Sequence, residues 1–205
     1  GTYTEVDAVL DATTITGRGA VTATLSDTSI SVANANLIAA KTSGAITATI
    51  TETDLDTPIG LDTGNAWTVV VDKQTEEDPD TDGDQLVTTI DAGNLNTLDG
   101  LTTEVVTVTA PAITGTLAEL VTAYGNNSPG DLANRTISGL ETIAITVEDA
   151  SITQAELETA QDYSTGVLTA TIATGDISGT DTVTNGTVNE IATLAVDSFT
   201  DVNTN

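Results

Sequence analysis

One acidic stretch of the chain has residue types and a spacing that could bind a metal ion. Four aspartates stand at alternate positions: Asp78, Asp80, Asp82 and Asp84. With a turn at Gly83, they match the first half of a calcium-binding loop. A complete loop needs a bidentate Glu at its twelfth position, where this chain has Thr89, so Glu76 or Glu77 would have to complete the shell. The stretch predicts a weak Ca²⁺ site, and the alternative is a solvated acidic loop.

Most other catalytic chemistry is excluded by composition. The chain has no Cys and no His, so it lacks the Ser–His–Asp and Cys–His arrangements and ordinary zinc sites. Four basic residues and no Gly-rich phosphate loop leave phosphoryl transfer without its electrostatic clamps. A pair of carboxylates could hydrolyse glycosides, but the aromatic platforms on offer for a sugar are Trp67, Tyr124 and Tyr163. We therefore predict that the protein is not an enzyme.

The net charge restricts the partners. Against 31 acidic residues there are four basic ones, which gives a formal charge of −27. Such a surface repels the phosphates of nucleic acids and anionic lipid headgroups. No apolar run reaches the roughly twenty residues of a membrane span. Since the chain lacks Met, we expect Gly1 to follow a cleavage or to mark a fragment, and we predict an exported protein located outside the cell or on its surface.

Five-residue segments with alternating polarity recur along the chain. They are V21-T-A-T-L25, I46-T-A-T-I50, W67-T-V-V-V71, L86-V-T-T-I90, V106-T-V-T-A110, I143-A-I-T-V147 and L168-T-A-T-I172. In most of them the first, third and fifth side chains are apolar, and the second and fourth are Thr. This period of two predicts strands with one buried and one solvated face.

The connecting segments carry the signals of short helices. They are S31-V-A-N-A-N-L-I-A-A40, D91-A-G-N-L-N-T-L-D-G100, T114-G-T-L-A-E-L-V-T-A123 and T153-Q-A-E-L-E-T-A160. Each opens with Ser, Thr or Asp, which are N-cap residues, and has apolar residues three or four apart. Each is followed by a glycine, for which we expect a positive φ angle. The glycines are Gly44, Gly100, Gly125 and Gly166.

A strand, a corner, one or two helical turns and a second corner form a unit of roughly 20–25 residues, a length typical of one coil of a repeat protein. The predicted fold class is therefore a β-rich solenoid, with parallel β-helix-like coils and short helical turns. We predict one repeat-built domain over residues 1–205, with coils starting near residues 21, 46, 67, 86, 106, 143, 168 and 191. Residues 72–85 and 124–136 are predicted as inserted loops. An antiparallel β-sandwich is the alternative.

Three stretches carry a resemblance to a known group of proteins. They are D-A-G-N-L-N-T-L-D-G-L-T-T at 91–103, V-T-V-T-A-P-A-I-T-G-T-L-A-E-L at 106–120 and V-E-D-A-S-I-T-Q-A-E-L at 147–157. The chain resembles repeat modules of large cell-surface proteins of cyanobacteria and structural proteins of marine cyanophages. The resemblance covers about two thirds of the chain and implies an extracellular structural or adhesive role, with no catalytic residue.

These observations predict a non-enzymatic structural protein outside the cell, a self-assembling subunit of a surface layer, sheath or filament. Residues 3–10 and 191–196 are predicted as strands, and copies of the chain would join through these strand edges at its two ends, because open edges must be capped or paired. The residues predicted for this contact are Tyr3, Val6, Val9, Ile191, Leu194 and Val196. One alternative is a fibre or decoration protein of a phage virion. Another is a calcium-dependent adhesin that binds glycans or a neighbouring cell surface.

Overall fold

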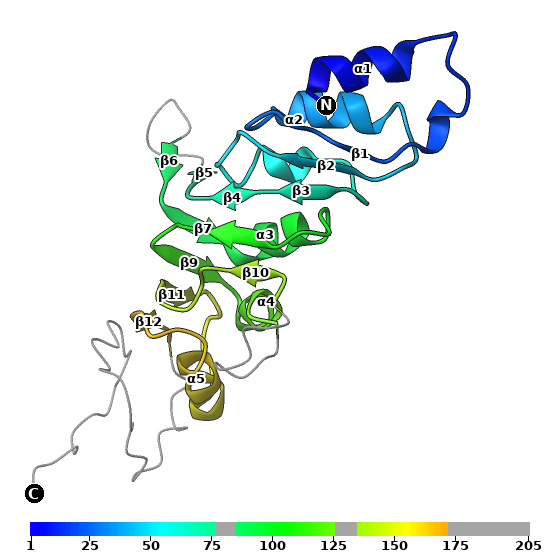
Figure 1. Ribbon diagram of the computed structural model, residues 1–205. Coiled ribbons are helices and arrows are strands. Elements are labelled where there is room, and N and C mark those ends of the chain that lie inside the picture. Colours follow the sequence, from blue (N-terminus) through cyan, green and yellow to red (C-terminus); the bar gives the residue numbers. More distant parts are fainter. Residues whose placement is uncertain (77–84, 126–134, 172–205) are drawn as a thin grey trace, which may run out of the picture.

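The computed structural model describes residues 1–76, 85–125 and 135–171. Figure 1 shows the elements following one another in chain order, from α1 at one end to α5 and β12 at the other. Within these residues there are five α-helices: α1 (Tyr3–Asp11), α2 (Val32–Ala39), α3 (Ala92–Asp99), α4 (Leu117–Ala123) and α5 (Gln154–Gln161). Two short 3₁₀ helices accompany them: η1 (Arg18–Ala20) and η2 (Pro58–Gly60). None of these helices is long and apolar enough to cross a membrane.

The strands are short and form three small all-parallel sheets. The first sheet has the order β1 (Ala23–Thr24), β2 (Ile46–Thr49), β3 (Ala66–Thr68). The second has the order β10 (Ile137–Ser138), β8 (Val106–Val108), β4 (Val70–Val71). The third has the order β12 (Leu168–Thr169), β11 (Ala144–Val147), β9 (Ala112–Gly115), β7 (Thr89–Asp91). A separate antiparallel pair consists of β5 (Gln74–Glu76) and β6 (Gln85–Val87).

The predicted β-solenoid is wrong. The protein has mixed α/β content, and its three parallel sheets are open rather than closed into coils. The physical reason lies in the connecting segments, each of which forms a capped helix of seven or eight residues, so that helices, and no further closing strand of the described residues, link the parallel strands. Parallel strands need long crossover connections, and a helix is the usual one. The β-sandwich alternative is also wrong, because a sandwich consists of antiparallel sheets, whereas in the described residues only β5 and β6 pair that way.

The alternation in the five-residue segments does produce one buried face. In the segment from Ile46 to Ile50 the first, third and fifth side chains are buried, while Thr47 is half-buried and Thr49 is exposed. The same pattern buries Trp67 completely, as expected for a tryptophan that opens a strand. Its indole Nε1 donates a hydrogen bond to the carbonyl of Asp62 at 2.9 Å, so the buried ring leaves no polar atom unpaired.

Four helices begin where the N-cap residues predicted, with an offset in α4. The side chains of the N-cap residues accept hydrogen bonds from the third helical amide in each case: Ser31 for α2, Asp91 for α3, Thr116 for α4 and Thr153 for α5. In α4 the segment expected to start at Thr114 starts later, because Ala112–Gly115 is strand β9. Each cap satisfies an amide that the first turn of a helix would otherwise leave unpaired.

The glycines after the helices have two different roles. Gly125 has a positive φ of 77°, as predicted for the end of a helix. The prediction is wrong for Gly44, Gly100 and Gly166, which do not have a positive φ, and Gly100 is helical with a φ of −68°. Gly44 and Gly166 instead allow the close approach of two backbones. A Cβ at Gly44 would lie 2.5 Å from the carbonyl carbon and oxygen of Val21, and one at Gly166 would overlap the carbonyl oxygen of Ile143.

The N-terminal segment differs from the prediction. Residues 3–10 were expected to be strand, but they belong to helix α1 (Tyr3–Asp11). The physical reason is a capping box: Thr2 and Glu5 each bind the other's backbone amide, which closes the first turn of a helix. The predicted strand at the opposite end, residues 191–196, and most of the two predicted inserted loops lie outside the described residues.

Candidate assembly end

The residues predicted to bind Ca²⁺ lie outside the described part of the chain. Asp78, Asp80, Asp82 and Asp84 all fall within residues 77–84, as does Glu77. The described residues beside them form the antiparallel pair β5 and β6. In the described part of the chain no group of three Asp or Glu side chains is placed to hold a metal ion.

The predicted assembly residues at the N-terminal end lie on helix α1 rather than on a strand. Tyr3 and Val6 are half-buried and pack against the core. Val9 faces the solvent and is 46% exposed. Helix α1 thus covers the end of the apolar core and leaves Val9 accessible, while Ile191, Leu194 and Val196 lie outside the described residues.

Several polar contacts hold α1 in place. The carboxylate of Glu5 accepts a hydrogen bond from the amide of Thr2 at 2.8 Å. This bond lowers the pKa of Glu5 from its usual value, because it stabilises the ionised form. The amide of Tyr3 donates to the carboxylate of Asp27, which follows β1, at 2.6 Å. The helix is therefore attached to the first strand through its own N-terminus.

Two of the four cationic side chains lie at this end. The ammonium of Lys41, just after α2, contacts Asp7 at 2.5 Å and Asp11 at 2.8 Å. The hydrogen bond to Asp11, followed by that to Asp7, raises the pKa of Lys41. The guanidinium of Arg18 donates to the carbonyls of Leu10 and Ile15, the latter at 2.6 Å. These cations bind the C-terminal half of α1, where the helix dipole favours positive charge.

Arg18 and Lys41 also line an open hollow of about 630 Å³. Its other lining residues include Leu10 and Ile15, and Ile15 is 43% exposed. The two cations are matched by the two carboxylates of α1 that Lys41 contacts. In a chain of net charge −27, this hollow is therefore a place where charge is locally balanced.

The outer edge of the first sheet lies at the same end of the molecule. Strand β1 ends the order of its sheet, and its amides at Ala23 and Leu25 donate to the segment of β2. Because successive residues of a strand point their amides in opposite directions, those of Thr22 and Thr24 point away from β2. The carbonyl of Thr24 accepts a bond from the amino group of Gly1 at 3.3 Å, so the part of the edge before Thr24 is the more open.

Three acidic residues bind the first amide of a helix that precedes them in the chain. Asp27 accepts from α1, Glu52 from α2 and Asp149 from α4, over separations of 24, 20 and 32 residues. Each acid stands two positions after the last residue of a five-residue segment. Sequence reasoning missed this role, although that spacing is a signal that could have found it. These carboxylates stabilise the positive N-terminal ends of the helices.

Hydroxyl side chains in the turns that follow helices α2, α3 and α5 make a second kind of contact that the sequence did not predict. Thr42, Thr102 and Ser164 each donate to a carbonyl 21 to 35 residues earlier, at 2.7–2.8 Å. Each of these hydroxyls also accepts a bond from the amide two residues later, at 3.0–3.1 Å. The triplets T-S-G, T-T-E and S-T-G carry this pattern in the sequence. Each hydroxyl therefore joins its own segment to one that lies 21 to 35 residues earlier in the chain.

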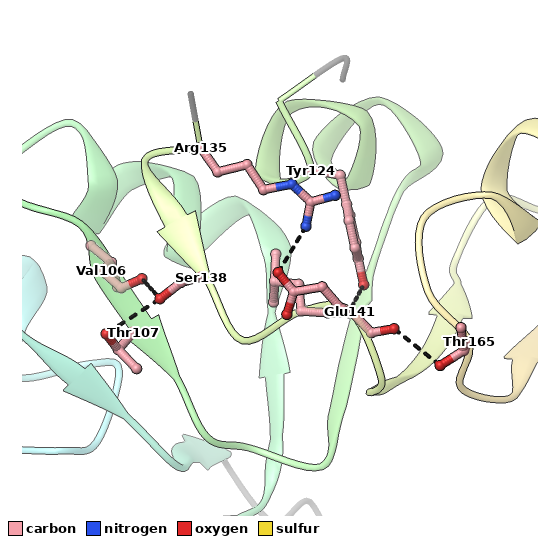
Figure 2. Close-up of polar contacts among 8 residues, drawn as sticks. Val106, Thr107, Tyr124, Arg135, Ser138, Glu141 and Thr165 are labelled. Atoms are coloured by element: carbon pink, nitrogen blue, oxygen red, sulfur yellow. Dashed lines mark hydrogen bonds and ion pairs between the residues drawn. The ribbon is translucent and has the colours of Figure 1, made fainter. Parts of the chain in front are cut away.

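The remaining two cations also serve internal contacts. Lys73 binds Thr53 at 2.7 Å and Asp72 at 2.9 Å. Figure 2 shows the guanidinium of Arg135 beside the carboxylate of Glu141, at 3.1 Å. All four cationic side chains of the protein thus have oxygen partners within the chain. Lys41, Lys73 and Arg135 are paired with carboxylates, and Arg18 is bonded to carbonyls.

Tyr124 forms the centre of the polar group in Figure 2. Its hydroxyl donates to the carbonyl of Leu140 at 3.1 Å, and its ring stacks on Tyr163 with centroids 4.9 Å apart. Burial raises the pKa of Tyr124 far above its usual value. A neutral, fully buried phenol with a backbone partner stabilises the core, and it is not placed to act as an acid or a base.

Comparisons of the chain with protein families, with curated proteins and with solved structures found no match.

Proposed function

We propose that this chain is a non-enzymatic structural protein that works outside the cell, as a subunit that assembles with copies of itself into a surface layer, sheath or filament. The observation that supports the proposal is the arrangement in Figure 1, where the elements follow one another in chain order and the two ends of the described structure differ. One end has the edge strand β1 with helix α1 beside it, and the other has β12 and α5. Two different ends that bind each other form a heterologous contact, which can propagate.

The contacts between units suit a load-bearing part. Corner hydroxyls and helix-capping carboxylates bind residues 20 or more positions apart, so separating two units breaks several hydrogen bonds together. The surplus of negative charge keeps copies apart at low ionic strength. Salt shortens the range of this repulsion to about 8 Å at physiological ionic strength. Assembly is therefore expected to depend on salt, as suits a protein of a saline environment.

The absence of His and Cys and the internal use of all four cations support a role without catalysis. Phosphate, nucleic acid and nucleotide partners need cationic side chains that can neutralise them. Here these side chains hold helix α1, a strand corner and the Tyr124 region instead.

The test is the mass of the full chain in solution, measured by size-exclusion chromatography with light scattering across a concentration series. It would be run at low and at seawater-like salt, with Ca²⁺ and with EDTA, and the largest species examined by electron microscopy. Open-ended growth with concentration is expected. A stable trimer insensitive to concentration would favour a virion fibre instead, and a monomer under all conditions would contradict self-assembly and leave the adhesin.

A further inference from the structure

We propose that the edge of β1 receives residues 190–197 of a second copy as an added parallel strand, with the acidic start of that segment lying at the hollow formed by Arg18 and Lys41. The inference rests on the proposed function and names the two surfaces that would meet. Strand addition at a sheet edge is a common way for one chain to bind another.

The first support is the backbone at the edge. No strand of the described residues lies beside β1 on its outer side, and the amides of Thr22 and Thr24 point that way. On that side the carbonyl of Thr24 and the amide of Ser26 are bonded, both to Gly1, so the open part of the edge is the part before Thr24. The open stretch is short, but strands of this protein pair over few residues: β1 with β2, and β11 with β12, each match at two positions. A contact of similar length would therefore continue the sheet in the manner of the protein itself.

The second support is the sequence of the chain after the described residues. The 34 residues from 172 to 205 contain I191-A-T-L-A-V196, an apolar run of strand length with a single Thr. Glu190 precedes this run and Asp197 follows it. An apolar sequence of strand length is suited to pair with the open edge of another strand.

The third support is charge. Residues 172–205 carry five acids and no Lys or Arg: Asp176, Asp181, Glu190, Asp197 and Asp201. Two of the four cations of the chain, Arg18 and Lys41, line the hollow at the N-terminal end. In a parallel pairing with the segment that begins at Val21, Glu190 would lie beside η1 (Arg18–Ala20), next to that hollow. Lys41 is already paired with Asp7 and Asp11, whereas Arg18 is bonded to carbonyls, which do not neutralise its charge. Elsewhere the incoming acids would meet a surface of their own sign, so the hollow directs the segment to this end.

The fourth support is the set of exposed apolar side chains near the hollow. Val9, Ile15 and Val21 are 46%, 43% and 38% exposed. They lie on α1, on the segment between α1 and η1, and just before β1. An apolar strand laid along Val21 would bury apolar surface at an end that α1 leaves partly uncovered, which adds to the backbone contacts.

Cysteine cross-linking tests the contact directly, because the chain has no Cys of its own. One full-length preparation carries Thr22→Cys and a second carries Ala192→Cys, with Thr193→Cys as a neighbour that reports the register. Cross-linked residues must have Cα atoms within roughly 7 Å. The matched control pairs the second preparation with Thr97→Cys, an exposed position on α3. Mixed disulfide dimers are expected to form at least tenfold faster with Thr22→Cys than with Thr97→Cys.

A charge variant supplies a second measurement. Glu190→Lys should weaken association roughly fivefold, the upper range for an exposed ion pair. Asp181→Lys changes the net charge by the same amount away from the apolar run and should leave association almost unchanged. The weakening caused by Glu190→Lys should become smaller in 1 M salt.

The outcomes separate the inference from the proposed function. Assembly of the full chain with equal cross-linking at Thr22 and Thr97, or with equal effects of the two lysine variants, would overturn the inference and leave self-assembly standing. A chain that stays monomeric at all concentrations would overturn both. The double variant Thr22→Cys/Ala192→Cys adds one further outcome. If it forms the disulfide within a monomer, the segment at the β1 edge comes from the same chain, and a second copy is not the occupant.

Discussion

The two ends of the described structure are held together by different forces. At the N-terminal end Lys41 joins α2 to Asp7 and Asp11 of α1 in ion pairs that stay partly open to water, with the side chain of Asp11 62% exposed. In the region of α4 and α5 the side chain of Arg135 is 4% exposed in its pair with Glu141, and Tyr124 and Tyr163 stack inside the core. The described structure thus ends in a partly solvated, charged contact at one side and in a largely buried, aromatic one at the other.

This difference indicates where the molecule is adaptable. Exposed ion pairs contribute little to stability and weaken as salt increases. The buried rings and the buried guanidinium of Arg135 are largely insensitive to salt, although the carboxylate of Glu141 is 40% exposed and can be screened. The end that we propose as the acceptor of a second copy is therefore also the end whose internal contacts respond to the ionic environment.

The largest expected effect tests the aromatic side of this comparison. Tyr124→Ala should lower the free energy of unfolding by about 3–5 kcal/mol, the range for removing a large buried aromatic side chain. Tyr124→Phe keeps the stacked ring and loses the bond to the carbonyl of Leu140, so its expected cost is about 1 kcal/mol. Urea unfolding followed by circular dichroism measures both, and equal losses for the two variants would show that the hydroxyl rather than the ring matters.

The next effect tests the close approach of two backbones at a glycine, which occurs near both ends of the described structure. Gly44→Ala and Gly166→Ala place a Cβ against the backbone of Val21 and of Ile143, and each should cost about 1–3 kcal/mol through overpacking. Gly19→Ala is the matched control, because a Cβ there meets no atom within 4 Å. Thermal unfolding of the three variants is the measurement. If only the Gly44→Ala chain were as stable as the control, the backbone at Gly44 would move away from Val21 at less cost than the backbone at Gly166 moves away from Ile143.

A smaller effect compares the two kinds of ion pair. Glu141→Gln leaves the guanidinium of Arg135 without its charged partner, while Nε of Arg135 is buried and has no hydrogen-bond partner among the described residues. We expect a loss of about 1–3 kcal/mol that persists in 1 M salt. Lys41→Gln should cost less, and its effect should disappear in 1 M salt because exposed pairs are screened. Denaturant unfolding at low and high salt measures both, and the reverse salt dependence would contradict the comparison.

The smallest effect is a pH dependence of opposite sign at two carboxyls. Asp99 ends α3, its Oδ2 accepts a bond from Thr136 at 2.8 Å, and burial raises its pKa. A raised pKa means that the charged form destabilises the fold, so Asp99→Asn should stabilise the protein at pH 7. This advantage should shrink as the pH falls through the folded-state pKa toward the ordinary value of 3.8.

Glu5 in α1 shows the opposite case. Its lowered pKa stabilises the fold above the ordinary value, and this contribution is lost as the pH falls through the folded-state pKa. Glu5→Gln should therefore destabilise the protein at pH 7 and have little effect at low pH. Melting temperatures measured from pH 7 to pH 3 would show the two variants converging on the wild type from opposite sides, and parallel curves would contradict both assignments.

Much of the local structure could be predicted from short stretches of sequence. The buried alternation from Ile46 to Ile50, the buried Trp67 and the N-caps Ser31 and Thr153 follow from residues within a few positions of each other. Helix α1 was missed although T2-Y-T-E5 carries the capping-box pattern. In residues 3–10 the apolar side chains fit a period of two as well as one near four, and the strand interpretation ignored the cap.

Of the candidate assembly end, the sequence offered Tyr3, Val6 and Val9 as contact residues, and of these three Val9 is the exposed one. It did not indicate that Arg18 and Lys41 line the same hollow. Strand β1 and helix α2 separate these two residues in the chain, and no local pattern brings them together. Nor did it show that Tyr3 and Val6 would be turned toward the core. Both facts depend on how α1 packs against its neighbour α2.

The sequence by itself determined the local features of this protein. These are short strands with one apolar face, helices that begin at hydroxyl or carboxyl side chains, and a large surplus of acidic residues. These features depend on neighbouring residues and on composition, which a reader of the chain has in full. Only the tertiary structure decided that the sheets stay open, that helices form the crossovers, and which acid binds which amide. Those choices rest on hydrogen bonds between residues 20 or more positions apart, and no local preference ranks one such partner above another.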